Sequence, residues 1–141
     1  MCCVPPFGKR LSILLPLLFL LVPTAASLAS DAAVPIRPEQ AREYEGKLVV
    51  VTMTVKSSKD AREHRETVFL DSEKDFMDQR NLGIAIRSEA IRELEEARRI
   101  TTPDDYFLGK RIRVTGKVVI REDRPYIDVR KADRIELLDK R

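Results

Sequence analysis

The alternation of apolar and polar positions is clearest in two stretches of the chain that share one pattern. Residues 46–55 (GKLVVVTMTV) and 109–118 (GKRIRVTGKV) both follow Gly-Lys-x-apolar-x-Val-Thr-x-x-Val. Apolar residues at every second position are typical of β-strands with one buried face. We therefore predict that both stretches are strands of one small barrel, the first of them over residues 47–56.

Further strands are predicted from the same period of two. Val68 and Leu70 share one face of a short apolar run, and Leu82, Ile84 and Ile86 share one face of the next. The segments between these runs are charged and polar, which favours loops. We predict strands over 67–71 and 82–87, a strand pair over 109–130 with a charged turn at 122–125, and loops over 57–66 and 72–81.

The period changes from two to about 3.6 after residue 87. Ala90, Ile91 and Leu94, followed by Ala97 and Ile100, form an apolar stripe that predicts an amphipathic helix beginning at residue 88. The sequence Thr-Thr-Pro at 101–103 ends this helix, and the apolar residues 106–108 are expected to plug the barrel. A shorter helix is predicted over 39–45, after Pro38 and before Gly46.

Three strands, a helix and two strands are the element order of the OB-fold, a five-stranded Greek-key barrel. Gly116 lies inside a predicted strand, and glycine at such a position often marks a bulge or a barrel bend. We therefore predict a mainly β protein over residues 38–141. Its expected architecture is a closed five-stranded OB-fold barrel with a helix between strands 3 and 4 and a short N-terminal helix.

Three segments also resemble a known group of proteins. They are residues 69–76 (FLDSEKDF), 109–116 and 124–129. They are similar to segments of small exported bacterial OB-fold proteins, which are usually described as nucleic-acid-binding-like, of the tRNA-anticodon or helicase type. The resemblance implies the OB-fold more strongly than a function, because one fold serves many functions.

The N-terminal residues have the layout of a secretory signal peptide. Lys9 and Arg10 precede the apolar run 11–22, and small residues follow over 24–30. The apolar run is too short to span the roughly 30 Å of hydrocarbon in a bilayer. We predict a signal peptide over 1–29, a linker over 30–37, and an exported protein, periplasmic or extracellular, with no stable membrane insertion after cleavage.

Removal of the signal peptide changes the cysteine content and the net charge of the protein. Cys2 and Cys3 leave with it, so the mature chain has no thiol for a disulfide, a nucleophile or a metal site. The formal net charge of +3 includes Lys9 and Arg10, which also leave. The remaining excess of basic residues is concentrated in residues 110–141, which contain eleven Lys and Arg residues and six Asp and Glu residues. A segment with such an excess of positive charge attracts anions.

OB-folds usually bind ligands on the face of strands two and three, between the loops that join strands 1–2 and 4–5. Binding of single-stranded nucleic acid needs basic side chains along the phosphates and aromatic rings under the bases. The expected ligand is therefore single-stranded nucleic acid or another polyanion. The alternative is a periplasmic protein-interaction or small-ligand module, since acidic residues in the same loops dilute the positive field. The predicted site comprises Lys56, Lys59, Arg62, Arg65, Phe69, Arg87, Arg121, Arg124, Tyr126 and Arg130.

No catalytic centre is predicted. His64 is the only histidine, and a single imidazole among charged neighbours does not make a metal site. The acidic residues over 71–78 resemble the start of a calcium loop, but Phe76 and Leu82 occupy the positions that need glycine and glutamate. Because no nucleophile or phosphate-loop motif occurs, we expect a non-catalytic module without cofactor or metal. A weak nuclease and weak calcium binding at 71–78 are the remaining alternatives.

Overall fold

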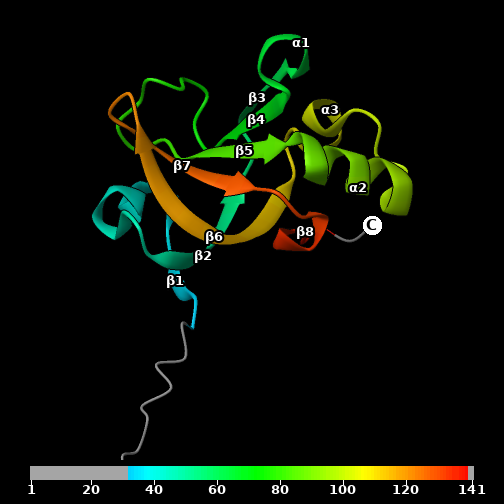
Figure 1. Cartoon of the computed structure of the whole chain (residues 1–141). Coiled ribbons are helices and arrows are strands. Elements are labelled where there is room, and N and C mark those ends of the chain that lie inside the picture. The colour runs from blue at the N-terminus through cyan, green and yellow to red at the C-terminus, as the bar shows by residue number, and fades with distance from the viewer. Residues whose placement is uncertain (1–31, 140–141) are drawn as a thin grey trace, which may run out of the picture.

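A computed structural model describes residues 32–139, so the predicted signal peptide lies outside the described residues (Figure 1). Within this range no helix is long and apolar enough to cross a membrane. The strands are β1 (Val34–Ile36), β2 (Leu48–Thr54), β3 (Ser57–Ala61), β4 (Thr67–Asp71), β5 (Gly83–Arg87), β6 (Arg111–Arg121), β7 (Arg124–Val129) and β8 (Ile135–Leu137). The helices are α1 (Arg62–Arg65), α2 (Ser88–Arg98) and α3 (Pro103–Phe107), with 3₁₀ turns η1 (Pro38–Tyr44) and η2 (Ala132–Arg134).

The strands form one mixed sheet in the order β1-β2-β6-β7-β5-β4-β3, with β8 also paired to β6. β3 lies at one end of this order, and β2 lies near the other end, next to the short β1. Along the chain, however, β2 and β3 are consecutive and are separated only by Val55 and Lys56. The Val55 amide donates to the Lys110 carbonyl at 3.0 Å, whereas the Lys56 amide donates to the Asp71 carbonyl at 3.0 Å. The backbone therefore changes hydrogen-bonding partner from one end of the path to the other at this point, and the sheet curves strongly (Figure 1).

This arrangement is consistent with an OB-like fold, but the prediction of a closed five-stranded barrel is wrong. The described residues form eight strands in an open path of hydrogen bonds. Two of the additional strands, β1 and β8, have only three residues each, which is too short to give a periodic signal. β1 lies in the expected linker and pairs parallel with β2, and β3 with α1 occupies the expected loop 57–66.

The two stretches with the shared pattern are both strands of one sheet, as predicted, and the structure shows that they lie side by side. They form β2 and β6, which pair antiparallel with Val51 opposite Val114, two residues at the same position of the pattern. The Gly46 amide donates to the Val118 carbonyl at 2.7 Å, and the Gly109 amide donates to the Val55 carbonyl at 2.8 Å. The two stretches, 46–55 and 109–118, are thus related by a local two-fold axis. Both glycines have a positive φ, +75° and +77°, which explains the residue type.

β6 changes its pairing partner next to Gly116, the residue predicted to mark a bulge or a barrel bend. Its first part pairs with β2 and β8, and from Val118 onward it pairs with β7. A side chain at Gly116 would begin 2.6 Å from Cγ2 of Ile127, so only glycine allows this close approach.

The inward faces of the strands form the hydrophobic core. Val49, Val51 and Val55 are fully buried, as are the inward residues of β4 and β5. α2 covers one end with Ala90, Ile91 and Leu94, and α3 adds the fully buried Phe107. The predictions for Ala97 and Leu108 are wrong, because both side chains are exposed.

Candidate functional site

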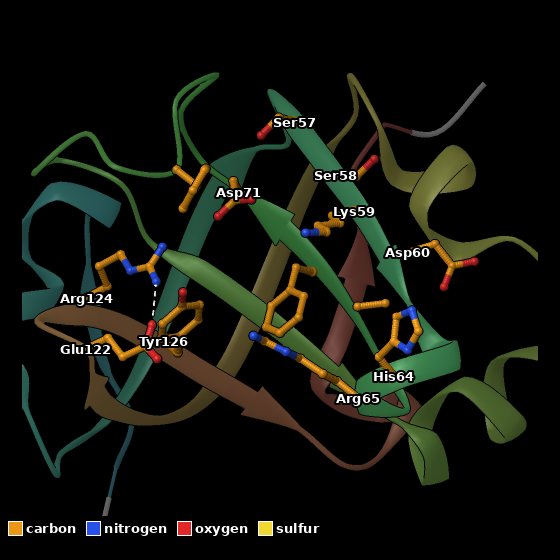
Figure 2. A pocket seen from close by; sticks show the side chains of 13 residues that line it. Ser57, Ser58, Lys59, Asp60, His64, Arg65, Asp71, Glu122, Arg124 and Tyr126 are labelled. Carbon is orange, nitrogen blue, oxygen red and sulfur yellow. Dashed lines mark hydrogen bonds and ion pairs between the residues drawn. The ribbon is translucent and has the colours of Figure 1, made fainter.

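A groove of about 680 Å³ lies on the outward face of β3, β4 and β7 (Figure 2). The loop 72–81 and the β6–β7 turn border one end of it, and α1 borders the other. This is the sheet face predicted to bind a ligand. The lining residues are Ser57, Ser58, Lys59, Asp60, Ala61, His64, Arg65, Phe69, Asp71, Phe76, Glu122, Arg124 and Tyr126.

Two aromatic rings flank small residues on the central strand of this face. β5 lies between β4 and β7, and its outward residues Gly83 and Ala85 pair with Tyr126 and Phe69 respectively. A side chain at Gly83 would begin 2.4 Å from Cε1 of Tyr126, so the tyrosine ring lies directly over the glycine. The two rings are 6.0 Å apart with planes at 63°, the edge-to-face arrangement that aromatic pairs prefer. Both rings predicted as stacking platforms therefore lie in one site.

A third ring comes from the loop 72–81 and was not predicted. Phe76 is 52% exposed and lines the groove. The Arg124 guanidinium lies 5.0 Å from the centre of the Phe76 ring and 6.0 Å from that of Tyr126, within the range of cation–π attraction. The apolar pair at 76–77 inside a charged loop was the signal in the sequence that could have identified it.

Asn81 fixes the base of this loop. Its side-chain nitrogen donates to Asp71 Oδ1 at 2.8 Å, and its side-chain oxygen accepts from the Glu73 amide at 3.0 Å. Ser72 Oγ donates to the same oxygen at 3.3 Å. Since Asn81 and Ser72 are both buried, these bonds are shielded from water and tie the two ends of the loop together.

Five of the ten predicted ligand-binding residues line the groove: Lys59, Arg65, Phe69, Arg124 and Tyr126. Within residues 32–139, Lys59 and Arg65 have no ion-pair partner. Arg65 extends from α1 back across the strands toward Tyr126, and the Lys59 ammonium points into the groove (Figure 2). These two cations are therefore available to an anionic ligand.

The other five predicted residues do not line the groove, and each of them is paired with an acidic side chain. Sequence reasoning could not assign these partners, which depend on strand register and loop path. Lys56 pairs with Glu73 at 3.0 Å, Arg62 with Asp60, Arg130 with Glu89 at 3.0 Å, and both Arg87 and Arg121 with Asp128.

Asp128, beside the groove on β7, is held between two arginines. Arg87 donates to its Oδ1 from Nε at 3.0 Å and from Nη2 at 2.8 Å, and Arg121 donates from Nη1 at 3.0 Å and to the second oxygen from Nη2. Burial acts to raise the pKa of Asp128, but the hydrogen bonds from Arg121 and Arg87 outweigh it and lower the pKa. Two guanidinium groups around one carboxylate leave a positive charge next to Ala85, with which Asp128 pairs.

The groove itself contains three acidic residues in different environments. A hydrogen bond from the Arg62 side chain lowers the pKa of Asp60, and Glu122 accepts from Arg124 at 2.9 Å. Asp71 has no ion-pair partner within the described residues, and it is only 8% exposed. Burial raises the pKa of its carboxyl group, although the hydrogen bond from Asn81 acts in the opposite direction.

His64 is exposed and lines the end of the groove nearest α1. Over residues 32–139, no three histidine, cysteine, aspartate or glutamate side chains gather as a metal site would require. In the loop whose acidic residues resemble the start of a calcium site, Asp75 and Asp78 accept hydrogen bonds from the backbone amides of Met77 and Arg80, at 2.9 and 2.8 Å.

No protein-family model matches the chain, and no curated protein matches it in sequence. Solved structures do resemble it. A protein assigned as an aspartyl-tRNA synthetase from Leishmania major Friedlin has 13% identity and a TM-score of 0.49, over 82% of this chain and 22% of that one.

Two asparaginyl-tRNA synthetases are similar to the same extent. The enzyme from Pyrococcus horikoshii has 15% identity and a TM-score of 0.46, over 77% of this chain and 23% of its own. The Entamoeba histolytica enzyme, in complex with asparaginyl-adenylate, has 13% identity and a TM-score of 0.48, over 77% of this chain and 24% of its own. The chain thus spans about a quarter of the length of these enzymes. Likeness at this level concerns the path of the backbone, and any function has to be argued from the groove.

Proposed function

We propose that this chain is a non-catalytic OB-like module that binds single-stranded nucleic acid in the groove. The observation that carries the proposal is the gathering of three exposed or half-buried rings, Phe69, Phe76 and Tyr126, with two cations. These cations, Lys59 and Arg65, have no ion-pair partner in the part of the chain that the structure describes. Stacking platforms with basic side chains beside them are the features by which proteins bind single strands without strong sequence preference.

The rings fit bases better than they fit a featureless polyanion. Stacking of one base on an aromatic side chain contributes about 1–3 kcal/mol. The planes of Phe69 and Tyr126 differ by 63°, so one flat base stacks on only one of them. The groove therefore has platforms for two successive bases, with Phe76 beside Tyr126 at the same end.

Lys59 and Arg65 are the expected contacts to the phosphates of the bound strand. Lys59 lies on β3 directly opposite Phe69 in the pairing with β4, and Arg65 reaches the groove from α1. Arg124 is already engaged with Glu122 and two rings, so we expect two principal phosphate contacts. Each neutralised phosphate of a single strand contributes about −0.7 to the slope of log affinity against log salt, so a slope of roughly −1.4 is expected.

Fluorescence anisotropy with a labelled strand of about twelve nucleotides, measured over a salt series, tests the proposal. Lys59→Ala combined with Arg65→Ala should weaken binding and flatten the salt slope. The matched control is Lys131→Ala with Arg92→Ala, which removes the same charges from exposed positions outside the groove. Absence of binding at low salt, or equal loss in both double variants, would refute the proposal.

A second candidate function is a protein-interaction or small-ligand module. It is favoured by the charge balance of the groove, where Asp60, Asp71 and Glu122 match Lys59, Arg65 and Arg124 in number. A partner that binds this groove with little dependence on salt, while nucleic acid fails to bind, would support it.

We also propose that the protein is exported, from the leader pattern of residues 1–29. N-terminal sequencing of the mature protein from separated cell fractions tests this. Export predicts a periplasmic or extracellular protein whose first residue lies near Ser30, and a protein that retains Met1 in the cytoplasm would contradict it.

A further inference from the structure

A carboxylate lies on the floor of a groove that otherwise suits an anionic strand. From the point where a Gly83 side chain would begin, Asp71 Oδ1 is 3.5 Å away and Cε1 of Tyr126 is 2.4 Å away. The carboxylate is therefore close to the edge of the tyrosine ring. Figure 2 shows Asp71, Tyr126 and Arg124 at the same end of the groove.

The position of this carboxylate is fixed, and it has no ion-pair partner within residues 32–139. The Asn81 amide nitrogen holds Oδ1 at 2.8 Å, and Arg124, the nearest arginine at this end, is bound to Glu122. The two carboxylate oxygens together offer about four acceptor sites, so the hydrogen bonds from the side chains of Asn81 and Ser57 leave capacity for a ligand. A phosphate would be repelled here, so the ligand has to present hydrogen-bond donors to Asp71.

A base stacked on Tyr126 would place its edge toward this acceptor. Guanine presents two adjacent donors, N1–H and the exocyclic N2 amino group, which match the two oxygens of a carboxylate. Adenine and cytosine present one amino group beside an acceptor nitrogen, and thymine or uracil presents one N–H between two carbonyls. Only guanine among the common bases therefore offers a donor to each oxygen without an opposing acceptor.

We propose that Asp71 binds the Watson–Crick edge of a guanine stacked on Tyr126, so that the groove prefers single strands that contain guanine. The inference rests on the proposed nucleic-acid function and adds a base preference to it. A guanidinium or ammonium group of a peptide would also offer donors to Asp71. Lys59 and Arg65, which line the same groove and have no ion-pair partner within residues 32–139, repel such a cation, and this favours the neutral base.

The test compares thymine strands of about twelve nucleotides that carry a single central guanine, inosine or adenine. One guanine per strand avoids four-stranded structures, and inosine differs from guanine only in lacking the N2 amino group. A matched bidentate contact discriminates by roughly tenfold, so guanine should bind about that much more tightly than adenine, with inosine between them.

Asp71→Asn should remove this preference while the strand without guanine binds at least as well as before. The substitution keeps an oxygen that accepts from Asn81. Asp78→Asn is the matched control, since Asp78 lies in the loop that follows Asp71 but does not line the groove, and it should keep the preference.

The outcomes separate the two proposals. If no strand binds, the nucleic-acid function itself fails. If strands bind equally, or if the guanine preference survives Asp71→Asn, only the role of Asp71 is overturned. Tight binding of an arginine-containing peptide that depends on Asp71 would also overturn it, in favour of a cation site.

Discussion

Gly83→Ala is a perturbation that changes the groove without removing any group proposed to contact the ligand. Gly83 lies on β5 under the ring of Tyr126, and its φ is not positive, so alanine fits the backbone. Alanine in a strand is favoured over glycine by roughly 0.5–1 kcal/mol in conformational entropy. The substitution therefore acts mainly through the contact with the tyrosine ring.

The size of the effect follows from one distance. The new Cβ would lie 2.4 Å from Cε1 of Tyr126, whereas carbon atoms pack at about 3.5–4.0 Å. The ring has to move by about an ångström or more, away from the position in which it faces Phe69. Loss of one stacking platform corresponds to about 1–3 kcal/mol, or a roughly five- to 150-fold larger dissociation constant for a single strand.

Anisotropy at low salt measures this change, with thermal unfolding to confirm that the variant is folded. Tyr126→Leu should weaken binding to a similar degree. The control is Gly46→Ala, where the positive φ strains the new residue but nothing lies within 4 Å of its side chain. That variant should lose roughly 1–2 kcal/mol of stability and keep its affinity. A folded Gly83→Ala protein with unchanged affinity would show that Tyr126 is not a platform.

Three further substitutions test the interactions that support the groove. Asn81→Ala leaves buried partners of the loop unsatisfied, so it should cost about 1–3 kcal/mol and speed amide exchange in residues 72–81. Asp128→Asn should cost about 1–2 kcal/mol at neutral pH, because it removes the acceptor held by Arg87 and Arg121. The lowered pKa of Asp128 means that its stabilisation is present above the ordinary pKa and is lost as pH falls through the folded value, so the variant should approach the parent in acid. Asp71→Asn should behave in the opposite way, because the raised pKa of Asp71 means that its ionisation is unfavourable in the folded state. The variant should therefore be more stable than the parent at neutral pH. This gain in stability should be absent below the ordinary pKa of an aspartate. Denaturant unfolding across pH measures both effects.

Hydrophobic periodicity was sufficient to predict the central strands and the main helix. β4 occupies the predicted residues 67–71, and α2 begins at Ser88 as the apolar stripe indicated. These elements bury one face, so their period is visible in the sequence. β3 was missed because its sequence, SSKDA, has one apolar residue, and its place depends on pairing with β4.

The site was predicted only in part, because some of its residues follow from the fold and others depend on contacts between distant side chains. The outward face of β4 and the β6–β7 turn were assigned from the OB-fold order, which brought Phe69, Arg124 and Tyr126 into consideration. The role of Asn81 and the pairing of Asp128 with two arginines depend on contacts across 7 to 41 positions of the chain. A single sequence does not indicate which acidic and basic side chains form ion pairs. Five of the eight basic residues predicted for the site are therefore paired with acidic side chains and do not line the groove.

Chemical-shift mapping by NMR tests the central claim most directly. Addition of a single-stranded oligonucleotide to the ¹⁵N-labelled protein at low salt should shift amide signals most around Lys59, Phe69 and Tyr126, on β3, β4 and β7. A spectrum that does not change, or shifts confined to β1 and β8, would contradict the assignment of the groove as a nucleic-acid site.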